Sequence, residues 1–447
     1  MSNLSAPAYR HRIFLLILAM ALLNYVDRGA MSYAAAGITR EYGFDKSTWG
    51  AILGYFGYGY ILGALCGGLL ADRFGPRRVW LVAGAAWSVF EILTPFAGHI
   101  GLAFLGGSTI AGFATVRVLF GFAEGPTYSL INKSVANWAT PKERGAVVSV
   151  GLLSTPLGAL LTAPVAVGLQ QATGGWRSMF VILGVASILL LLVFMRRFTN
   201  RPDDNPRVPE AEKAFLREQH AAHHGSNVAA ESRVPWWSFF QNRSLVLNAA
   251  GYFAFIYVTF LLVTWTPKYL QDQFHYNLSA LWYMGMIPWT GACITVLLGG
   301  RLTDWLLRRS GSLVVARSWF AAACLLITTL CFILVSKVHT VSGVIALMTI
   351  ANAFNSLPNA VYWAVILDSA PPTRTGTFSG LTHFIANTAS FLAPTLTGYL
   401  TTQYGYSAMF VAAAVATGIG MSAMLLVRPG IRSGSALREP VVVASET

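Results

Sequence analysis

Long apolar runs separated by short polar loops make up most of this chain. Twelve of these runs hold about 20 mostly apolar residues each, the length that a helix needs to cross a lipid bilayer. They lie near residues 12–36, 48–71, 78–98, 103–129, 145–170, 177–196, 244–266, 279–300, 316–336, 341–367, 375–402 and 406–427. The pattern predicts an all-α polytopic membrane protein with twelve transmembrane helices.

The composition agrees with this prediction. The 447 residues are 55% hydrophobic and only 11% charged, against about 25% charged in ordinary soluble domains. The net charge of +13 does not indicate nucleic-acid binding, because the basic residues lie between the apolar runs. If both termini are cytoplasmic, most Lys and Arg residues fall on cytoplasmic segments, in agreement with the positive-inside rule. The exceptions are Arg28 and Arg117 within spans, and Arg40, Lys46, Arg177, Lys268 and Lys337 outside.

The chain repeats in two halves of six spans. "GLLADRFGPRR" follows the second span and "GRLTDWLLRR" follows the eighth, while "PKERGAVVSV" corresponds to "PPTRTGTFSG". We expect two pseudo-symmetric six-helix bundles, at 1–196 and 244–428. A cytoplasmic linker at 197–243, with a short amphipathic helix around 209–220, joins them, and 429–447 is a cytoplasmic tail. Parallel halves with a substrate site between them are typical of rocker-type secondary transporters.

Four ionisable residues lie deep in the first half. Asp27 and Arg28 are in the first predicted helix, and Arg117 and Glu124 are in the fourth. A charge at the bilayer centre costs about 2.5–3.5 kcal/mol on insertion scales, so such residues mark functional sites. Arg117 and Glu124 are two helical turns apart and share a helix face. Arginine has a planar fork suited to carboxylates, whereas Asp and Glu can change charge.

Three motifs resemble a known family of transporters. "GLLADRFGPRR" looks like the signature between helices 2 and 3 of the major facilitator superfamily. "NYVDR", "RVLFGFAEGP" and the W-x-x-P-x-E-R pattern of Trp138–Arg144 resemble its anion:cation symporter family. The resemblance implies a transporter, not an enzyme, that carries an organic anion, often a sugar acid, with protons or sodium across a bacterial inner membrane. It also implies that helices 1 and 4 line a central cavity.

The resemblance divides roles among the buried charges. It implies that Arg28 and Arg117 bind the substrate carboxylate and that Asp27 and Glu124 load and release protons. Protonation of Glu124 then frees Arg117 from its internal partner for the anion. The alternative is two structural ion pairs, Asp27–Arg28 and Arg117–Glu124, that merely lock helices 1 and 4 together. Tyr60 on helix 2 resembles a family position that faces the substrate.

The second half has no ionised carboxylate deep in its helices. Its buried polar residues are neutral: Asn352, Asn355 and Asn359 on helix 10, and His383 and Asn387 on helix 11. Asn387 looks like a family position that contacts substrate, and His383 shares its face one turn away. The three asparagines share a face as well, which fits either substrate contact or hydrogen bonding between helices. Glu91 in helix 3 is a further intramembrane carboxylate with either a functional or a structural role.

A group of charged loop residues differs from these buried ones. It comprises Asp72, Arg73, Arg77, Arg78, Asp304 and Arg308. The resemblance implies a charged latch between the halves that forms in one conformational state and breaks in another. The simpler explanation for the arginines is the ordinary excess of positive charge on cytoplasmic loops.

Other functions remain open at this point. An enzyme is disfavoured, because the chain has no phosphate-binding loop, no H-E-x-x-H motif and no sizeable extramembrane domain. The alternatives to sugar-acid uptake are an organic phosphate antiporter, which would also use paired arginines, uptake of an aromatic or dicarboxylic acid, and a proton-coupled exporter of drugs or metabolites. We expect no cofactor and no metal, since the four cysteines lack metal-ligand spacing. The expected partners are a small organic anion, a proton or sodium ion and the bilayer, with a functional monomer.

Overall fold

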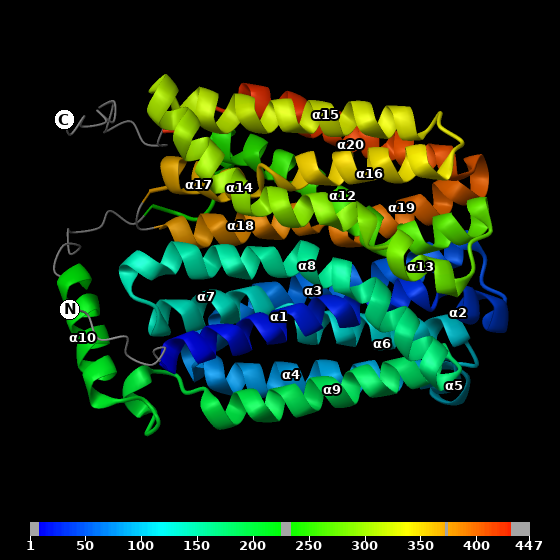
Figure 1. Ribbon diagram of the computed structural model, residues 1–447, viewed down its shortest axis with the longest axis horizontal. Helices are drawn as coiled ribbons and strands as arrows, with labels where there is room; N and C mark the ends of the chain where they lie inside the picture. Colours follow the sequence, from blue (N-terminus) through cyan, green and yellow to red (C-terminus); the bar gives the residue numbers. More distant parts are fainter. Residues whose placement is uncertain (1–8, 225–233, 372–373, 431–447) are drawn as a thin grey trace. The chain divides into compact units, whose positions relative to one another are not determined.

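The computed structural model describes residues 9–224, 234–371 and 374–430, which form helices and no strand (Figure 1). Up to the linker, the helices are α1 Tyr9–Tyr33, α2 Ala35–Tyr42, α3 Lys46–Phe74, α4 Pro76–Leu93, η1 Thr94–Phe96, α5 Ala97–Phe104, α6 Thr109–Glu124, α7 Thr127–Trp138, α8 Pro141–Thr173, α9 Trp176–Arg197, η2 Pro202–Asp204 and α10 Glu210–His224. The later helices are α11 Ser238–Gln241, α12 Arg243–Phe274, α13 Leu278–Met284, α14 Ile287–Ser310, η3 Val314–Trp319, α15 Phe320–Val335, α16 Val341–Ser356, α17 Asn359–Ser369, α18 Thr375–Asn387, α19 Ala389–Tyr404 and α20 Tyr406–Leu426. The tail predicted at 429–447 lies almost wholly outside the described residues.

The predicted spans correspond to these helices. Within the described residues, ten helical segments are long and apolar enough to cross a membrane. The other two predicted spans are each divided, into α6 with α7 and α18 with α19, and none of these four helices reaches 18 residues. The linker helix expected around 209–220 is found as α10.

One predicted boundary is wrong. The span expected at 103–129 begins at the end of α5, and after a turn the structure starts the next helix, α6, only at Thr109. Gly106 and Gly107 have φ values of 67° and 76°, a backbone conformation that breaks the apolar run into two helices. Ser108 then caps α6, because its side chain accepts a hydrogen bond from the Ala111 amide at 3.2 Å.

The helices pack into two compact units. Unit 1 comprises residues 1–229, 262–289 and 390–403, and unit 2 comprises 230–261, 290–389 and 404–447, as far as these residues are described. One unit boundary, at 229/230, therefore falls in the linker, and the others fall within α12, α14 and α19. The bundle limits predicted from the sequence, 1–196 and 244–428, stay a prediction.

Glycines bring α3 and α6 close together inside unit 1. A Cβ on Gly125 would lie 2.5 Å from the Tyr60 carbonyl oxygen, and one on Gly59 would lie 2.7 Å from the Phe122 nitrogen. Small residues at such crossings allow membrane helices to approach closely. Gly59, in the "GYFGYGYILG" segment of α3, is therefore a packing residue. This contact also sets the distance between Tyr60 on α3 and the buried charges on α6.

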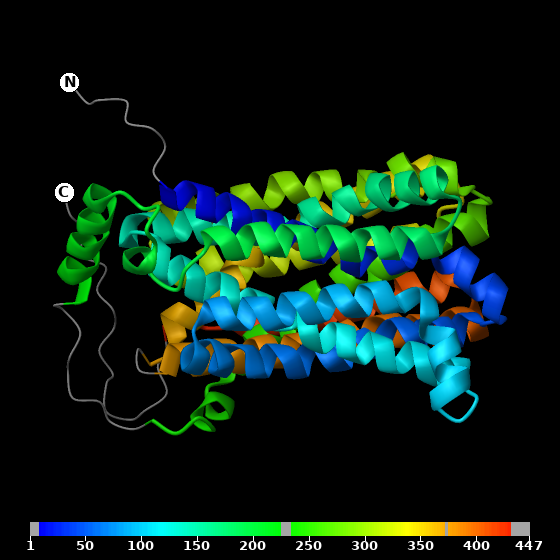
Figure 2. The same cartoon turned by 90° about the horizontal axis from the view of Figure 1, so that it is seen from below.

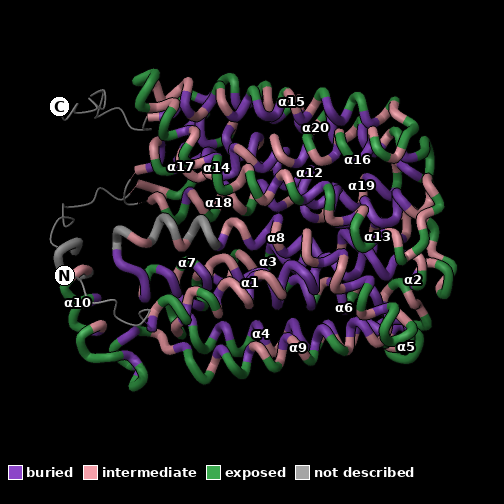
Figure 3. The backbone as a smooth tube through the Cα atoms, viewed as in Figure 1, coloured by how far each residue is buried: buried purple, intermediate pink, exposed green. Residues whose placement is uncertain are grey.

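The burial pattern separates helix faces. Along α9, buried and exposed residues alternate at the spacing of a helix, so that one face is buried and the other is exposed (Figure 3). Its buried face includes Phe180, Gly184 and Ser187, which pack into unit 1. Figure 1 shows α4 and α9 side by side along their lengths. The buried side of α9 thus lies against α4 and α1, where the charged residues of the first half are found.

Candidate functional site

The core of the site is an ion pair between α1 and α6. Arg28 donates from Nε at 3.1 Å and from Nη2 at 3.0 Å to the same oxygen, Oε2, of Glu124. Its Nη2 also donates to Oδ1 of Asn24 at 3.3 Å. The two charged side chains are only 4% and 0% exposed. Such a pair is fully desolvated, and breaking it leaves an uncompensated buried charge.

Aromatic rings surround the Arg28 guanidinium. Its central carbon lies 4.6 Å from the ring centroids of Tyr25 and Tyr60 and 4.9 Å from that of Phe56. Rings at this distance attract a cation through their negative faces. The structure therefore places Tyr60 next to Arg28, and its contact with substrate stays a prediction. Sequence reasoning missed Tyr25 and Phe56, although Tyr25 is three residues before Arg28 and Phe56 is four before Tyr60, the spacings at which helical residues are neighbours.

Arg117 is buried near this pair but does not form the ion pair expected from the sequence. Its guanidinium lies 4.9 Å from the Phe56 ring centroid and 5.7 Å from that of Phe120. Its Nε has no hydrogen-bond partner among the described residues. The expected Arg117–Glu124 pair is replaced by Arg28–Glu124, because seven residues along one helix leave a separation of about 10 Å. Arg28 reaches Glu124 from a neighbouring helix instead.

Asp27 points away from Arg28, to which it is adjacent in sequence. Its Oδ2 accepts a hydrogen bond from Ser187 Oγ of α9 at 2.8 Å, and its side chain is 1% exposed. Successive residues of a helix project about 100° apart, so Asp27 faces α9 while Arg28 faces α6. The structural pair Asp27–Arg28 considered from the sequence does not form in this structure.

A chain of hydroxyl groups extends from the aromatic side of the site. The hydroxyls of Tyr25 and Tyr128 lie 2.9 Å apart, and the Tyr128 hydroxyl lies 2.7 Å from Thr155 Oγ1. These contacts connect α1, α7 and α8. Tyr128 was not recognisable as a site residue from the sequence, since tyrosine is common in apolar helices and no charge marks this one.

Unit 2 holds the neutral polar residues predicted in the second half. The His383 ring lies 6.0 Å from that of Tyr252 and 5.8 Å from that of Trp363, and Asn387 donates to the His383 carbonyl at 2.8 Å. Asn355 donates to the Phe255 carbonyl of α12 at 3.2 Å. Asn355 thus makes the hydrogen bond between helices that was the alternative to substrate contact.

The predicted latch residues make contacts within their own units. Asp72 pairs with Lys133 of α7 at 2.7 Å, and Arg77 donates to the Met195 carbonyl at 2.9 Å. Asp304 lies 3.7 Å from Arg317. Arg73, Arg78 and Arg308 are exposed. A latch between the halves stays a prediction.

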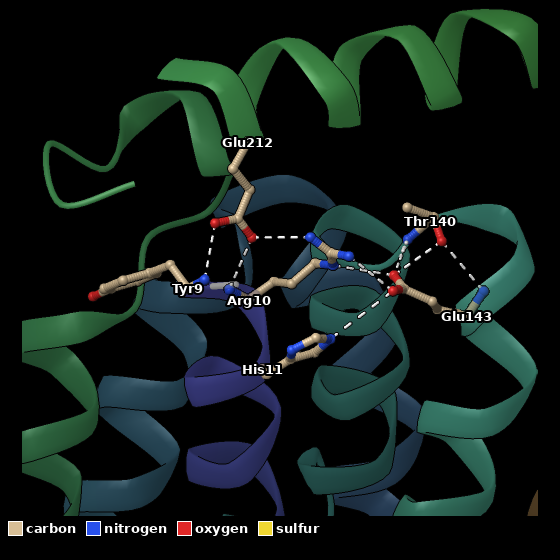
Figure 4. A network of polar contacts seen from close by, with 6 residues as sticks. All are labelled: Tyr9, Arg10, His11, Thr140, Glu143 and Glu212. Carbon is tan, nitrogen blue, oxygen red and sulfur yellow. Dashed lines mark hydrogen bonds and ion pairs between the residues drawn. The ribbon is translucent and has the colours of Figure 1, made fainter. Parts of the chain in front are cut away.

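A second polar network lies at the N-terminal end of α1 (Figure 4). The Glu212 carboxylate of α10 accepts from the backbone amides of Tyr9 at 2.8 Å and Arg10 at 3.1 Å. The Arg10 side chain donates to Glu212 at 3.2 Å and to Glu143 at 2.9 Å. In Figures 1 and 2, α10 lies crosswise at this end of α1. The linker helix is therefore tied to the first half of the chain.

Glu143 also closes a capping box at the start of α8. Thr140 Oγ1 accepts from the Glu143 amide, and the Glu143 carboxylate accepts from the Thr140 amide at 3.2 Å. Partial burial by itself would raise the pKa of Glu143, but the hydrogen bonds from Arg10 and Thr140 outweigh it and lower this pKa below its ordinary value. The carboxylate is thus held in its charged form at neutral pH.

Twelve apolar helices, two repeated halves and a buried arginine–carboxylate pair define a polytopic membrane transporter. Residues 17–394 match the family model described as "Major Facilitator Superfamily". The chain belongs to this superfamily, and it is a transporter rather than an enzyme.

Comparison with known proteins gives relatives over nearly the whole chain. A hexuronate transporter of Bacillus subtilis is 28% identical over 96% of this chain and 98% of its own. A probable galactarate/D-glucarate transporter of Escherichia coli is 27% identical over 88% of this chain and 87% of its own. A probable sulfoacetate transporter of Cupriavidus necator is 29% identical over 94% of both.

Solved structures share the fold at lower identity. A bacterial homologue of the human lysosomal transporter Spinster, inward-facing and occupied, has a TM-score of 0.72 at 16% identity, over 95% of this chain and 97% of that chain. A D-xylose–proton symporter has a TM-score of 0.66 at 17% identity, over 95% of this chain and 99% of that chain. These likenesses support the twelve-helix fold.

Proposed function

We propose that the protein is a proton-coupled symporter that takes up an organic anion by alternating access. Sugar acids such as hexuronates, aldonates and aldarates are the proposed substrate class, in line with the relatives that carry hexuronate and galactarate or glucarate. The observation that carries the proposal is the buried Arg28–Glu124 pair with Arg117 nearby. It combines a fixed positive charge for the anion with a carboxylate that can take up a proton.

The proposed coupling is an exchange of partners on Arg28. In the structure, Glu124 accepts hydrogen bonds from both the Nε and the Nη2 of the Arg28 guanidinium. Protonation of Glu124 removes its negative charge and weakens its hold on Arg28. The fork then accepts the substrate carboxylate in the two-pronged geometry that arginine favours. Proton and anion binding therefore strengthen each other, as thermodynamic linkage requires.

Arg117 and Tyr60 complete the proposed anion site. Arg117 has an unused Nε among the described residues, so it can bind a second carboxylate or a hydroxyl oxygen of the substrate. Tyr60 lies over Arg28 and fixes the orientation of the guanidinium. Asn387 and His383 of unit 2 are proposed to contact the hydroxyl groups of the substrate. Asp27, hydrogen-bonded to α9, is proposed as a second proton-carrying carboxyl.

The remaining parts of the proposal concern setting and conformational change. We propose that the protein is a functional monomer of the bacterial inner membrane. The distribution of Lys and Arg supports the further proposal that both termini are in the cytoplasm. The charged residues Asp72, Arg73, Arg77, Arg78, Asp304 and Arg308 are proposed to stabilise one of the alternating states.

Reconstitution tests this function. Purified protein is placed in liposomes loaded with a pH-sensitive dye, and sugar acids, aromatic acids, dicarboxylates, sugar phosphates and neutral sugars are added in turn. Acidification of the interior with one carboxylate class is the expected result. Exchange of labelled phosphate compounds without acidification would instead indicate an antiporter. Glu124→Gln is expected to abolish acidification, and Glu218→Gln, on the exposed side of α10, is the matched control.

A further inference from the structure

Glu91 is a buried carboxyl that the proposed coupling between Glu124 and Arg28 does not use. It lies on α4, is 1% exposed, and its Oε1 has no hydrogen-bond partner among the described residues. An unpaired carboxylate is expensive in such a place, because its charge loses the solvation of water. Either a proton or a nearby positive charge is needed to keep it there.

The packing of α9 brings Glu91 and Asp27 to the same place. Gly184 of α9 lies so close to α4 that a Cβ on it would be 2.8 Å from the Ser88 carbonyl oxygen and 2.5 Å from Ile92 Cγ1. Ser88 and Ile92 are on either side of Glu91 on α4. Ser187, less than one turn beyond Gly184, donates to Asp27. One segment of α9 therefore touches both carboxyl-bearing turns.

The charges around Glu91 do not neutralise it. It interacts electrostatically with Asp27 from α1 and with Glu124 and Arg117 from α6. At this level α9 contributes the neutral Ser187, and among the described residues α3, α7 and η1 bring no charge to it. Three carboxyls and two guanidiniums, those of Arg28 and Arg117, thus form one buried cluster. If all were ionised, the cluster would carry an uncompensated negative charge.

Asp27, like Glu91, has one carboxyl oxygen without a hydrogen-bond partner among the described residues. Ser187 donates a hydrogen bond to Oδ2 of Asp27, whereas Oδ1 of Asp27 accepts no hydrogen bond from the described residues. A single proton, carried by either Asp27 or Glu91, removes the excess charge of the cluster. Two carboxylates in one site behave in this way, since both cannot ionise together without strong repulsion.

We propose that Asp27 and Glu91 form an electrostatically coupled carboxyl pair that carries one proton, and that Glu91 is a positioning residue that sets the pH at which Asp27 exchanges its proton. This inference rests on the proposed proton-coupled function and specifies a second proton site within it. That site lies between α1, α4 and α9, on the side of α1 that faces away from the Arg28–Glu124 pair. The two carboxyls titrate as a unit rather than separately.

The variant Glu91→Gln tests the pair. Glutamine keeps the size and polarity of the side chain but removes its charge, so Asp27 no longer has a negative neighbour. The pH of half-maximal uptake is expected to fall by about one unit or more, the scale of a coupled pair. At a fixed pH above the midpoint, uptake would be reduced about tenfold. Glu91→Asp retains a carboxyl and is expected to restore a profile near that of the wild type.

An infrared titration measures the protonation of the same carboxyl pair without any substrate. The purified wild-type protein is expected to keep a protonated-carboxyl carbonyl band at a pH where exposed carboxylates are ionised. In Glu91→Gln this band should titrate at lower pH, whereas Glu218→Gln should leave it in place. If Glu91→Gln does not fold, Asp27→Asn tests the pair from the other side, with the same expected shift.

The outcomes separate two failures. Wild-type vesicles that show no anion-induced acidification would refute the proposed symport, whatever the infrared result. An infrared band and an uptake profile that both stay at the wild-type pH in Glu91→Gln would overturn the carboxyl pair alone. In that case Glu91 would be a structural residue that holds α4 in the bundle.

Discussion

The Arg28–Glu124 pair allows a quantitative prediction for Glu124→Gln. The closest nitrogen–oxygen distance is 3.0 Å, and two unit charges about 4 Å apart interact by about 4 kcal/mol at the effective dielectric constant of a protein. A substrate anion must displace this interaction when Glu124 is charged. Since each 1.4 kcal/mol is a factor of ten, the charged carboxylate is expected to weaken anion binding by up to about a thousandfold.

Glutamine removes this competition but leaves Arg28 without a counter-ion. Loss of one partner from a buried ion pair costs about 3–5 kcal/mol of stability, and the amide oxygen of glutamine recovers part of this by accepting a hydrogen bond. The variant is therefore expected to unfold at lower temperature than the wild type. A bound anion restores the missing charge, so the stabilisation by ligand should be larger in the variant than in the wild type.

Thermal unfolding of detergent-purified protein measures both effects. The anion identified in liposomes is titrated at pH 6 and pH 8 into the wild type, Glu124→Gln and Glu218→Gln. Anion affinity should fall with rising pH in the wild type and in Glu218→Gln, but stay constant in Glu124→Gln. Proton-driven accumulation should be lost in Glu124→Gln while exchange of labelled anion continues. A variant that kept the wild-type pH dependence of binding would refute the exchange of partners on Arg28.

Three further substitutions follow from the described contacts. Arg117→Lys removes the planar fork but keeps the charge, and it should weaken anion binding about 10- to 100-fold; unchanged binding would remove Arg117 from the site. Because the pKa of Glu143 is lowered, its stabilisation is present above the unfolded pKa of about 4.3 and lost as pH falls through the folded pKa. Glu143→Gln, which weakens the contact with Arg10, should therefore cost up to about 1 kcal/mol at pH 7 and progressively less as the pH falls, as melting curves over this pH range would show. Gly184→Leu should cost about 1–3 kcal/mol of stability in thermal unfolding, whereas Gly168→Leu, with no neighbour within 4 Å of a Cβ, should not.

The sequence predicted the helices well because bilayer-length apolar runs depend only on local composition. It failed at residues 103–108, where the chain stays apolar while two glycines turn it. The sequence also does not show which segments pack together in each compact unit. Residues 262–289 and 390–403 belong with the first half in unit 1, and such packing depends on three-dimensional contacts that no run of residues encodes.

The sequence located the buried charges of the candidate site but not the ion pair that they form. Asp27, Arg28, Arg117 and Glu124 stand out because charges are rare within apolar runs. Which carboxyl pairs with which arginine depends on which helices are neighbours. The partner of Glu124 is Arg28 of α1, whereas the sequence suggested Arg117 of α6. Tyr128 carries no charge, so nothing distinguished it from other aromatic residues of apolar helices.

The contact between α10 and the start of α1 has a consequence for biogenesis. Glu212 caps the first amides of α1 across 203 positions of the chain, so this cap forms only after α1 to α9 have been synthesised. During translation, the first helix must enter the membrane while its N-terminal amides donate hydrogen bonds to water or lipid headgroups. Its final position can be fixed only when the linker emerges from the ribosome. The packing of the first half of the chain is thus completed by a contact that becomes possible only after the linker helix has been synthesised.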